Sequence, residues 1–179
     1  REFVFDTDEG PRKSDVKGLS RLRPVFDAKG TVTAGNSSQT SDGAAFLMVV
    51  SEKMMKKLGA KPIAKMLSYH VSGVEPRIMG IGPVKATQKA LKRAGLSMND
   101  IDIIELNEAF SAQALACTRA LGLADNDERI NPNGGAIAIG HPLGMTGARL
   151  LNTATIELHE KEKKYALVTM CIGVGQGYA

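Results

Sequence analysis

The stretch Tyr165-Ala166-Leu167-Val168-Thr169-Met170 reads as a buried strand, and it delivers Cys171 at its end. A helical pattern over residues 146–160 precedes it, with apolar residues at the spacing of one helix face. Further upstream, residues 101–106 are predicted to form a compact strand, and residues 108–121 follow as a helix. Strands that alternate with helices in this way predict an α/β fold with a partly parallel sheet.

The pattern continues toward the amino end of the chain. A helix begins at Pro83, since proline is favoured in the first turn. Residues 62–74 are apolar and partly β-branched and predict a long strand. Residues 44–50 are an apolar run of strand length, followed by a short helix over residues 52–58. The polar, turn-rich part before them is expected to be mostly loop.

Length and composition are those of a globular protein with a real core. The chain has 179 residues, of which 43% are hydrophobic and 23% charged. Its net charge of +4 fits a small anionic ligand and argues poorly for nucleic acid, because aromatic residues are few and no basic run occurs. No apolar run approaches the roughly 20 residues that span a bilayer, so membrane insertion is not expected.

The two cysteines, Cys117 and Cys171, lie far apart, and the sequence has no CxxC motif and no histidine pair at metal-ligand spacing. This usage indicates a reducing compartment and no metal site. We expect a cytoplasmic protein of bacterial type, or a peroxisomal or mitochondrial one if the source is eukaryotic. Cys117 lies on the apolar face of a helix and is expected in the core.

Residues 133–144 place His141 in a glycine-dense loop, just before a helix that Thr146 is expected to cap. A second glycine-framed segment begins at Cys171. In α/β folds, ligands gather beyond the carboxyl ends of the strands. Since Asn107 directly follows one predicted strand, we expect Asn107, His141 and Cys171 to converge on one rim of the sheet.

These three side chains are the parts of a site for acyl transfer. A histidine accepts a proton from a thiol near neutral pH, and a cysteine serves as a nucleophile or an acid/base. Amides of glycine loops stabilise an oxyanion by roughly 3–4 kcal/mol per donor. Each residue also has a structural alternative: His141 as a core histidine, Cys171 as a small buried apolar group, and Asn107 as a helix cap.

Four motifs, in order and spacing, resemble those of the thiolases. The coenzyme A loop of that family is similar to residues 36–45, and the three carboxy-terminal motifs are similar to Asn107-Glu108-Ala109-Phe110, Gly140-His141-Pro142 and Cys171-Ile172-Gly173-Val174-Gly175. Residues 78–83 and 175–177 look most like the 3-ketoacyl-CoA thiolases of fatty-acid β-oxidation. The resemblance covers essentially the whole chain.

The resemblance implies a thiolase-like fold of two similar halves, with a loop domain inserted in the first. Residues 1–40 are then the tail of the loop domain on the coenzyme A side. Residues 41–179 are the carboxy-terminal half-domain, a mixed five-stranded sheet covered by helices, truncated at its end. The nucleophilic cysteine of the family belongs to the amino-terminal half. Neither Cys117 nor Cys171 matches it, so the chain by itself is expected to be inactive.

The resemblance assigns catalytic roles to residues of the three carboxy-terminal motifs. These are the base that activates the nucleophile, the second acid/base, the residue that positions the water of a first oxyanion hole, and the amide of a second hole: His141, Cys171, Asn107 and Gly173. Contacts with coenzyme A are implied for Ser38, Phe110 and Arg12. Coenzyme A and acyl-CoA are substrates, and no metal or redox cofactor is implied. A homodimer or homotetramer is expected for the full-length protein.

The expected reaction is thiolytic cleavage of a 3-ketoacyl-CoA, or the reverse Claisen condensation of two acetyl-CoA molecules. A biosynthetic acetyl-CoA acetyltransferase is a rival within the class. Two other classes are a decarboxylating ketoacyl synthase, which would carry His or Asn in place of Cys171, and a non-catalytic coenzyme A-binding or scaffold protein.

Overall fold

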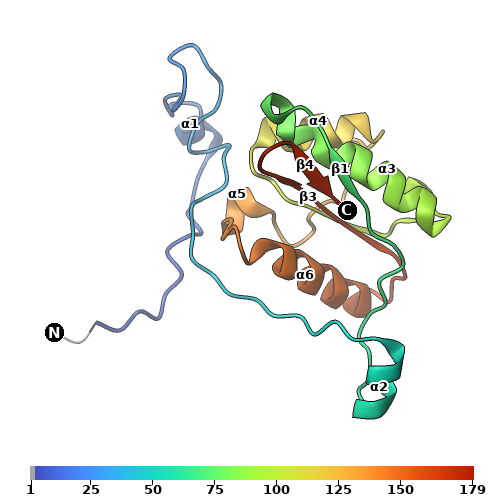
Figure 1. The fold of residues 1–179 in the computed structure, drawn as a ribbon. Coiled ribbons are helices and arrows are strands. Elements are labelled where there is room, and N and C mark those ends of the chain that lie inside the picture. The colour runs from blue at the N-terminus through green and yellow to red at the C-terminus, as the bar shows by residue number, and fades with distance from the viewer. Residues whose placement is uncertain (1–2) are drawn as a thin grey trace.

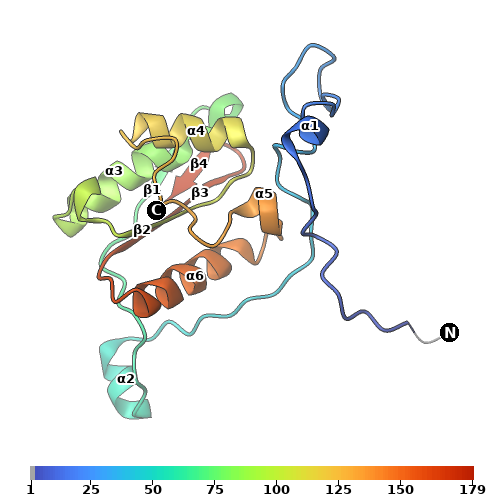
Figure 2. The ribbon, with the colours of Figure 1, turned by 180° about the vertical axis from the view of Figure 1, so that it is seen from behind.

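The computed structural model describes residues 3–179 and has three layers, with a sheet between two layers of helices (Figures 1 and 2). The strand order is β1-β4-β3-β2. The strands are β1 (Val71–Gly73), β2 (Ile103–Leu106), β3 (Ala166–Ile172) and β4 (Gln176–Tyr178). β2 and β3 are parallel, whereas β4 is antiparallel to both β3 and β1. The sheet is therefore mixed, as predicted.

Helices cover both faces of this sheet. α3 and α4 lie on one face, and α6 lies on the other with the short α5 near its amino end (Figures 1 and 2). Their bounds are α3 (Gly82–Ala94), α4 (Ser111–Ala120), α5 (Ala136–Ile139) and α6 (Thr146–Glu160). Short 3-10 helices occupy Pro76–Ile81 and Met98–Asp100. Between α4 and β2 the core packs apolar side chains of both, including Ile104, Leu106 and Cys117; the prediction of a core position for Cys117 is confirmed.

The amino end of α3 packs directly on β4, backbone against backbone. A Cβ added at Gly177 would lie 2.0 Å from the carbonyl carbon of Gly82, and one added at Gly82 would lie 2.5 Å from the carbonyl oxygen of Gln176. No side chain fits at either glycine without moving the helix away from the strand. This close approach holds α3 over the strand that follows the turn after Cys171.

Several predicted elements are confirmed, with small shifts of their ends. α6 ends at Glu160 as predicted, and α2 (Glu52–Leu58) ends at Gly59 as expected. The helix predicted from residue 108 begins at Ser111, after Phe110 as its N-cap residue. Asn107 is therefore not a helix cap. The predicted capping by Thr146 is wrong as well: the N-cap residue is Met145, and the Thr146 hydroxyl bonds elsewhere.

The predicted long strand over residues 62–74 is wrong for most of its length. Only Val71–Gly73 pair within the sheet, and His70 pairs with Ala179 through two backbone hydrogen bonds. Residues 62–67 are exposed and lie outside any helix or strand. The amide and carbonyl groups of a strand need a neighbouring strand to bond with, and residues 3–179 provide no such strand beside this segment.

The sheet of the described residues has four strands, whereas five were predicted. On the free side of β2 there is a single parallel bridge between Ile104 and Ile130. Backbone bonds join the amide of Ile104 to the carbonyl of Arg129, and the amide of Asn131 to the carbonyl of Ile104. The position beside β2 is therefore filled by backbone, although the stretch is too short to count as a strand.

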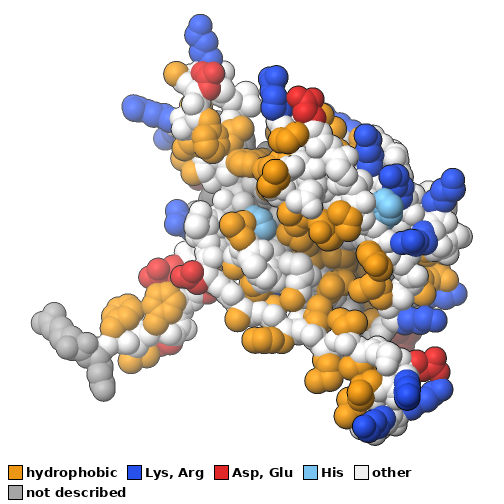
Figure 3. All heavy atoms as spheres, in the orientation of Figure 1, with side chains coloured by type: hydrophobic (Ala, Val, Ile, Leu, Met, Phe, Trp, Pro, Cys, Tyr) orange, Lys and Arg blue, Asp and Glu red, His pale blue; other side chains and the backbone are white. Residues whose placement is uncertain are grey.

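The part before β1 runs outside the layered body (Figure 1). It includes α1 (Val16–Leu19) and α2. Residues 3–40 are mostly loop, as expected, whereas the strand expected over residues 44–50 does not form. The apolar run of residues 44–50 has no regular structure, and Phe46 and Met48 are 90% and 82% exposed. Apolar side chains are spread over this face of the molecule (Figure 3). Within residues 3–179, no helix has both the length and the apolar character needed to cross a membrane.

Candidate active site

Asn107 lies at the carboxyl end of β2, fully buried beside β3. Its amide donates to the carbonyl of Thr169, which continues the parallel pairing of β2 with β3. The side chain of Asn131 takes the other edge of β2, where its Oδ1 accepts from the amide of Leu106 and its Nδ2 donates to the carbonyl of Leu106, both at 2.9 Å. The end of β2 that carries Asn107 is thus held from both sides, at the edge where ligands gather in α/β folds.

The glycine-dense loop that carries His141 is attached to this edge through Glu108. The carboxylate of Glu108 accepts from Nδ2 of Asn131 at 2.9 Å and from the amide of Ile137 in α5 at 3.3 Å. Gly135 makes this contact possible, because a Cβ there would lie 2.1 Å from Cδ of Glu108. A second bond ties the loop to α6, from Nδ2 of Asn133 to Oε2 of Glu157 at 2.7 Å.

The structure brings the side chains of Asn107 and His141 into contact. Nδ2 of Asn107 lies 3.3 Å from Nε2 of His141. The other ring nitrogen, Nδ1, lies 2.7 Å from the hydroxyl oxygen of Thr146. Oδ1 of Asn107 is buried and has no hydrogen-bond partner within the described part of the chain. An amide oxygen with this freedom accepts a hydrogen bond from a water or a substrate.

Cys171 lies near the carboxyl end of β3, at the same edge of the sheet as Asn107. Thr169 is the register partner of Leu106, so Cys171 and Asn107 come from neighbouring parallel strands just beyond this pair. The thiol is free and the residue is 8% exposed. The strand was predicted to end before Cys171, but it continues to Ile172 because Cys171 pairs with Gly177 of β4.

The environment separates the proton affinities of the two titratable groups. Burial lowers the pKa of His141 below its ordinary value, and the positive charge of Arg149 lowers it further. Burial raises the pKa of the Cys171 thiol. At neutral pH the imidazole is therefore neutral and able to accept a proton, whereas the thiol holds its proton and is able to donate it.

Gly173 lies in the exposed turn between β3 and β4. A Cβ added there would meet no atom within 4 Å in the described structure. Its neighbour Val174 has a φ of +66°, an unusual value for a β-branched residue. The structure thus places Gly173 at the correct end of the sheet, but among residues 3–179 it shows no contact that requires glycine.

Two of the residues predicted to contact coenzyme A lie side by side. Ser37 forms an antiparallel bridge with Phe110, and the amide of Ser38 donates to the carbonyl of Ala109 at 3.0 Å. The ring of Phe110 also meets Phe26 edge-on, with centroids 6.3 Å apart. Ser38 is therefore fixed next to the segment that carries Asn107.

The segment that contains Ser38 continues past His141. The amide of His141 donates to the carbonyl of Gln39 at 3.0 Å. Further along, residues 41–45 and residues 142–145 face each other across an open hollow. The predicted coenzyme A loop therefore runs along the glycine-dense loop and leads away from the site along this hollow.

Arg12 is not brought to the site by any bond. It is exposed on the segment before α1, and its side chain makes no hydrogen bond or ion pair within residues 3–179. Its predicted contact with coenzyme A stays a prediction.

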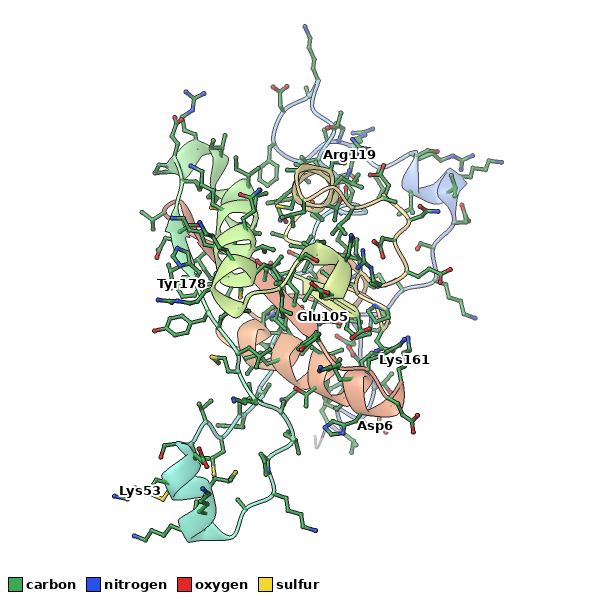
Figure 4. The ribbon with its side chains drawn as sticks, turned by 90° about the vertical axis from the view of Figure 1, so that its right-hand side faces the viewer. Asp6, Lys53, Glu105, Arg119, Lys161 and Tyr178 are labelled. Carbon is green, nitrogen blue, oxygen red and sulfur yellow. The ribbon has the colours of Figure 1, made fainter. Side chains whose placement is uncertain are left out.

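Several residues that build the site were not identified from the sequence. Thr146 and Glu108 contact the loop of His141, and a buried ion pair joins Glu105 of β2 to Arg149 of α6. Glu105 lies in the interior, whereas Lys161 lies at the far end of α6 (Figure 4). A charged residue inside an apolar strand run, as Glu105 is between Ile104 and Leu106, was the available signal, because buried charges need a partner.

Comparison with known proteins agrees with this geometry. Residues 60–179 match the family model described as "Thiolase, C-terminal domain", and residues 1–53 match "Thiolase, N-terminal domain". The predicted division after residue 40 falls inside the stretch matched by the amino-terminal model. The carboxy-terminal model covers β1 to β4 and every residue of the Asn107–His141–Cys171 edge.

Two curated bacterial relatives and one solved structure show the extent of the similarity. The chain is 56% identical to the 3-ketoacyl-CoA thiolase of Vibrio vulnificus, over 99% of this chain and 46% of the relative. It is 52% identical to the acetyl-CoA acetyltransferase of Syntrophomonas wolfei, over 99% and 45%. The human mitochondrial 3-ketoacyl-CoA thiolase in complex with CoA aligns with a TM-score of 0.88 and 46% identity, over 97% of this chain and 44% of that one.

The chain spans less than half the length of the relatives it matches. Within that length, the matched models, the high identity and the shared fold agree with one another. This chain, with its mixed sheet and its Asn107–His141–Cys171 edge, belongs to the thiolase family.

Proposed function

We propose that the protein to which this chain belongs transfers an acyl group to coenzyme A, by thiolytic cleavage of a 3-ketoacyl-CoA or by the reverse condensation of two acetyl-CoA molecules. The observation that carries the proposal is the 3.3 Å contact between Nδ2 of Asn107 and Nε2 of His141, at the sheet edge where β3 delivers Cys171. Two relatives, named acetyl-CoA acetyltransferase and 3-ketoacyl-CoA thiolase, support this class of reaction.

In the proposed cleavage, Nε2 of His141 takes the proton of a nucleophilic thiol. This thiol comes from the amino-terminal part of the family's chain, because neither cysteine here matches it. The thiolate attacks the 3-keto carbonyl carbon, and the bond between C2 and C3 of the substrate breaks. The acyl group stays on the nucleophile as a thioester, and the electron pair of the broken bond stays on the acetyl-CoA unit as an enolate.

Cys171 then completes the first half of the reaction. Its thiol donates a proton to C2 of the enolate, which releases acetyl-CoA. The Cys171 thiolate then takes the proton of the coenzyme A thiol, and the coenzyme A thiolate attacks the acyl thioester. The nucleophilic cysteine leaves as a thiolate and takes its proton back from Nε2 of His141, which restores all three groups. The directions of the two pKa values support these roles, since the base is neutral and the acid is protonated at neutral pH.

The remaining predicted residues serve binding and charge stabilisation in this proposal. Oδ1 of Asn107 positions the water of one oxyanion hole, and the amide of Gly173 contributes to a second. Ser38 and Phe110 contact the pantetheine arm; the human structure in complex with CoA supports coenzyme A as the ligand of this fold. Arg12 near the phosphates, a homo-oligomeric assembly and a bacterial cytoplasmic location stay predictions.

The test uses the full-length protein. Thiolysis of acetoacetyl-CoA and of a long-chain 3-ketoacyl-CoA is measured for the wild type, His141→Ala and Cys171→Ala. We expect both variants to lose at least about 10³-fold in kcat, as when a member of a catalytic unit is removed. Cys117→Ala, which alters the other buried cysteine, serves as the matched control and should keep most of the activity.

The outcomes distinguish the acyltransferase proposal from the non-catalytic scaffold alternative. If His141→Ala and Cys171→Ala fail while Cys117→Ala works, the acyltransferase proposal stands, and the ratio of the two substrates gives the chain-length preference. An inactive wild type that still binds coenzyme A supports the scaffold alternative. Wild-type turnover that neither variant changes excludes the proposed site.

A further inference from the structure

We propose that Thr146 is a positioning residue that holds His141 in one tautomer, with the proton on Nδ1 and the lone pair on Nε2. The inference rests on the proposed role of Nε2 as the base. It assigns a function to a residue that no motif of the sequence singled out for chemistry.

The direction of the hydrogen bonds around Thr146 fixes the proton on His141. The Thr146 hydroxyl oxygen lies 2.8 Å from the carbonyl oxygen of Pro142 and 2.7 Å from Nδ1 of His141. A carbonyl oxygen only accepts, so the single hydroxyl proton of Thr146 goes to Pro142. The Thr146 oxygen must then accept from His141, which requires a hydrogen on Nδ1.

The other side of the imidazole gives the same answer independently. Nε2 lies 3.3 Å from Nδ2 of Asn107, and an amide nitrogen only donates. Nε2 must therefore accept and carry the lone pair. The two contacts agree on one tautomer, and the base points toward Asn107 at the carboxyl end of β2.

Thr146 is itself held rigidly. It is 1% exposed, and its own amide also donates to the carbonyl of Pro142 at 3.0 Å. A β-branched side chain in a helix has few allowed rotamers, and the bond from hydroxyl to carbonyl uses one of them. The hydroxyl therefore costs little further entropy to order, and it presents a fixed acceptor to Nδ1.

The charged and titratable groups around His141 do not fix the tautomer. Arg149, three residues after Thr146 on α6, carries the charge that acts on the ring, and Glu105 of β2 pairs with it. Cys171 holds a neutral thiol at the same edge of the sheet. Arg149 opposes protonation of either nitrogen, whereas Thr146 distinguishes between the two.

Loss of the Thr146 oxygen has a defined chemical consequence. Without an acceptor, Nδ1–H would be left unpaired in a half-buried site, and only the longer 3.3 Å contact with Nδ2 of Asn107 would still favour this tautomer. The imidazole then shifts its proton to Nε2, where Oδ1 of Asn107, which has no partner among the described residues, can accept a hydrogen bond from it once the amide turns over. The nitrogen that faces the nucleophile then carries a hydrogen and no longer accepts one. A wrong tautomer at an otherwise intact catalytic histidine costs up to about 10⁴-fold in kcat in serine proteases.

The experiment compares Thr146→Val, Thr146→Ala and Thr146→Ser in the full-length protein, with His141→Ala alongside. Valine keeps the volume and alanine the helix, and both remove the acceptor; serine restores it. We expect kcat to fall by at least about 10²-fold for valine and alanine, with KM within threefold of the wild type and near-complete rescue by serine. Because an unpaired Nδ1–H also disfavours the imidazolium, the acidic limb of kcat/KM should move to lower pH in valine and alanine only.

A role in folding alone gives a different result. It would lower the amount of active enzyme without moving the acidic limb, and that outcome overturns the inference. If valine prevents folding, alanine and serine decide by the same criteria. If His141→Ala loses activity while Thr146→Val or Thr146→Ala keeps full activity, the positioning role of Thr146 is rejected. The proposed function is then unaffected. If His141→Ala leaves the activity unchanged, both the positioning role of Thr146 and the proposed function are rejected, since His141 would not be the base.

Discussion

Nη1 of Arg149 lies 3.0 Å from Oε2 of Glu105, and this ion pair joins α6 to β2 inside the protein. The Glu105 side chain is fully buried and that of Arg149 is 15% exposed. Glu105 stands two residues before Asn107, and Arg149 stands three residues after Thr146. The pair therefore fixes the two elements whose ends carry the contacts of His141.

The buried carboxyl of Glu105 predicts a pH-dependent stability. Burial raises the pKa of Glu105 to about 7, from 4.5, even though Arg149 opposes the rise. A raised folded-state pKa means that the folded protein binds the proton more tightly than the unfolded chain. This contribution is fully present below pH 4.5 and is lost as the pH rises through about 7.

Relative to Glu105→Gln, the wild type should lose roughly 3 kcal/mol of unfolding free energy across this window. Urea unfolding of both proteins at a series of pH values measures the difference. Glu52→Gln removes an exposed carboxylate on α2, and the difference in unfolding free energy between this control and the wild type should not change with pH. If the difference for Glu105→Gln is also independent of pH, the pKa of Glu105 is not raised by folding.

Arg149→Met should shift the activity profile toward higher pH. The positive charge of Arg149 lowers the pKa of His141, so its removal raises that pKa, and the base becomes protonated at a higher pH. The acidic limb of kcat/KM for thiolysis by the full-length protein reports this change. Lys89→Met, which removes an exposed cation on α3, serves as the control. A limb that stays in place, or moves to lower pH, contradicts the electrostatic role of Arg149.

The layered fold could be predicted where each element finds its partner within the chain. β2, β3 and α6 have apolar patterns that match their burial, and they pack on one another. The apolar runs at residues 44–50 and 62–67 are similar in composition, but they are hydrogen-bonded to α6 only through the side chains of Asn152 and His159 and have no neighbouring strand in residues 3–179, so they form no strand. A pattern predicts that a segment can pair, whereas the pairing itself depends on what lies beside it.

The site could be predicted as far as its motifs reached. Asn107 and His141 meet as expected, because strand ends and the following loops share one edge of the sheet. Thr146 was interpreted as a helix cap, which is the commonest use of threonine before a helical pattern. Its actual bonds to Pro142 and His141 depend on how the loop folds back onto α6, and residue types alone do not reveal that path.

Gly135→Ala should disrupt the attachment of the glycine-dense loop to β2. The new methyl group would lie 2.1 Å from Cδ of Glu108, so the carboxylate must leave Asn131 and Ile137. We expect a loss of about 1–3 kcal/mol in unfolding free energy and a lower kcat, because the loop also carries His141.

A double-mutant cycle identifies the cause of that loss. In a Glu108→Ala background, Gly135→Ala should cost much less than in the wild type, since the clashing group is gone. Gly144→Ala is the matched control in the same loop, because a Cβ there meets no atom within 4 Å in the described structure. Equal costs of Gly135→Ala in both backgrounds would exclude Glu108 as the reason for glycine at this position.

Val174→Asn should stabilise the turn that follows Cys171. Val174 is 83% exposed and has a φ of +66°, where the branched side chain crowds the backbone at a cost of about 1–2 kcal/mol. Asparagine tolerates this conformation, so we expect a gain of about 1 kcal/mol in unfolding free energy. Glycine relieves the same strain but makes the unfolded chain more flexible, so Val174→Gly should gain less.

Urea unfolding of the full-length variants tests the order, with Val16→Asn as the control. Val16 is 84% exposed in α1 and lacks the positive φ, so asparagine there should bring no gain. If Val174→Asn gains stability and loses thiolysis, the strained turn holds the Gly173 amide in its working position, as strain at functional sites often does. If Val174→Asn is less stable than the wild type, the valine side chain makes a contact that stabilises the protein by more than the strain that asparagine relieves.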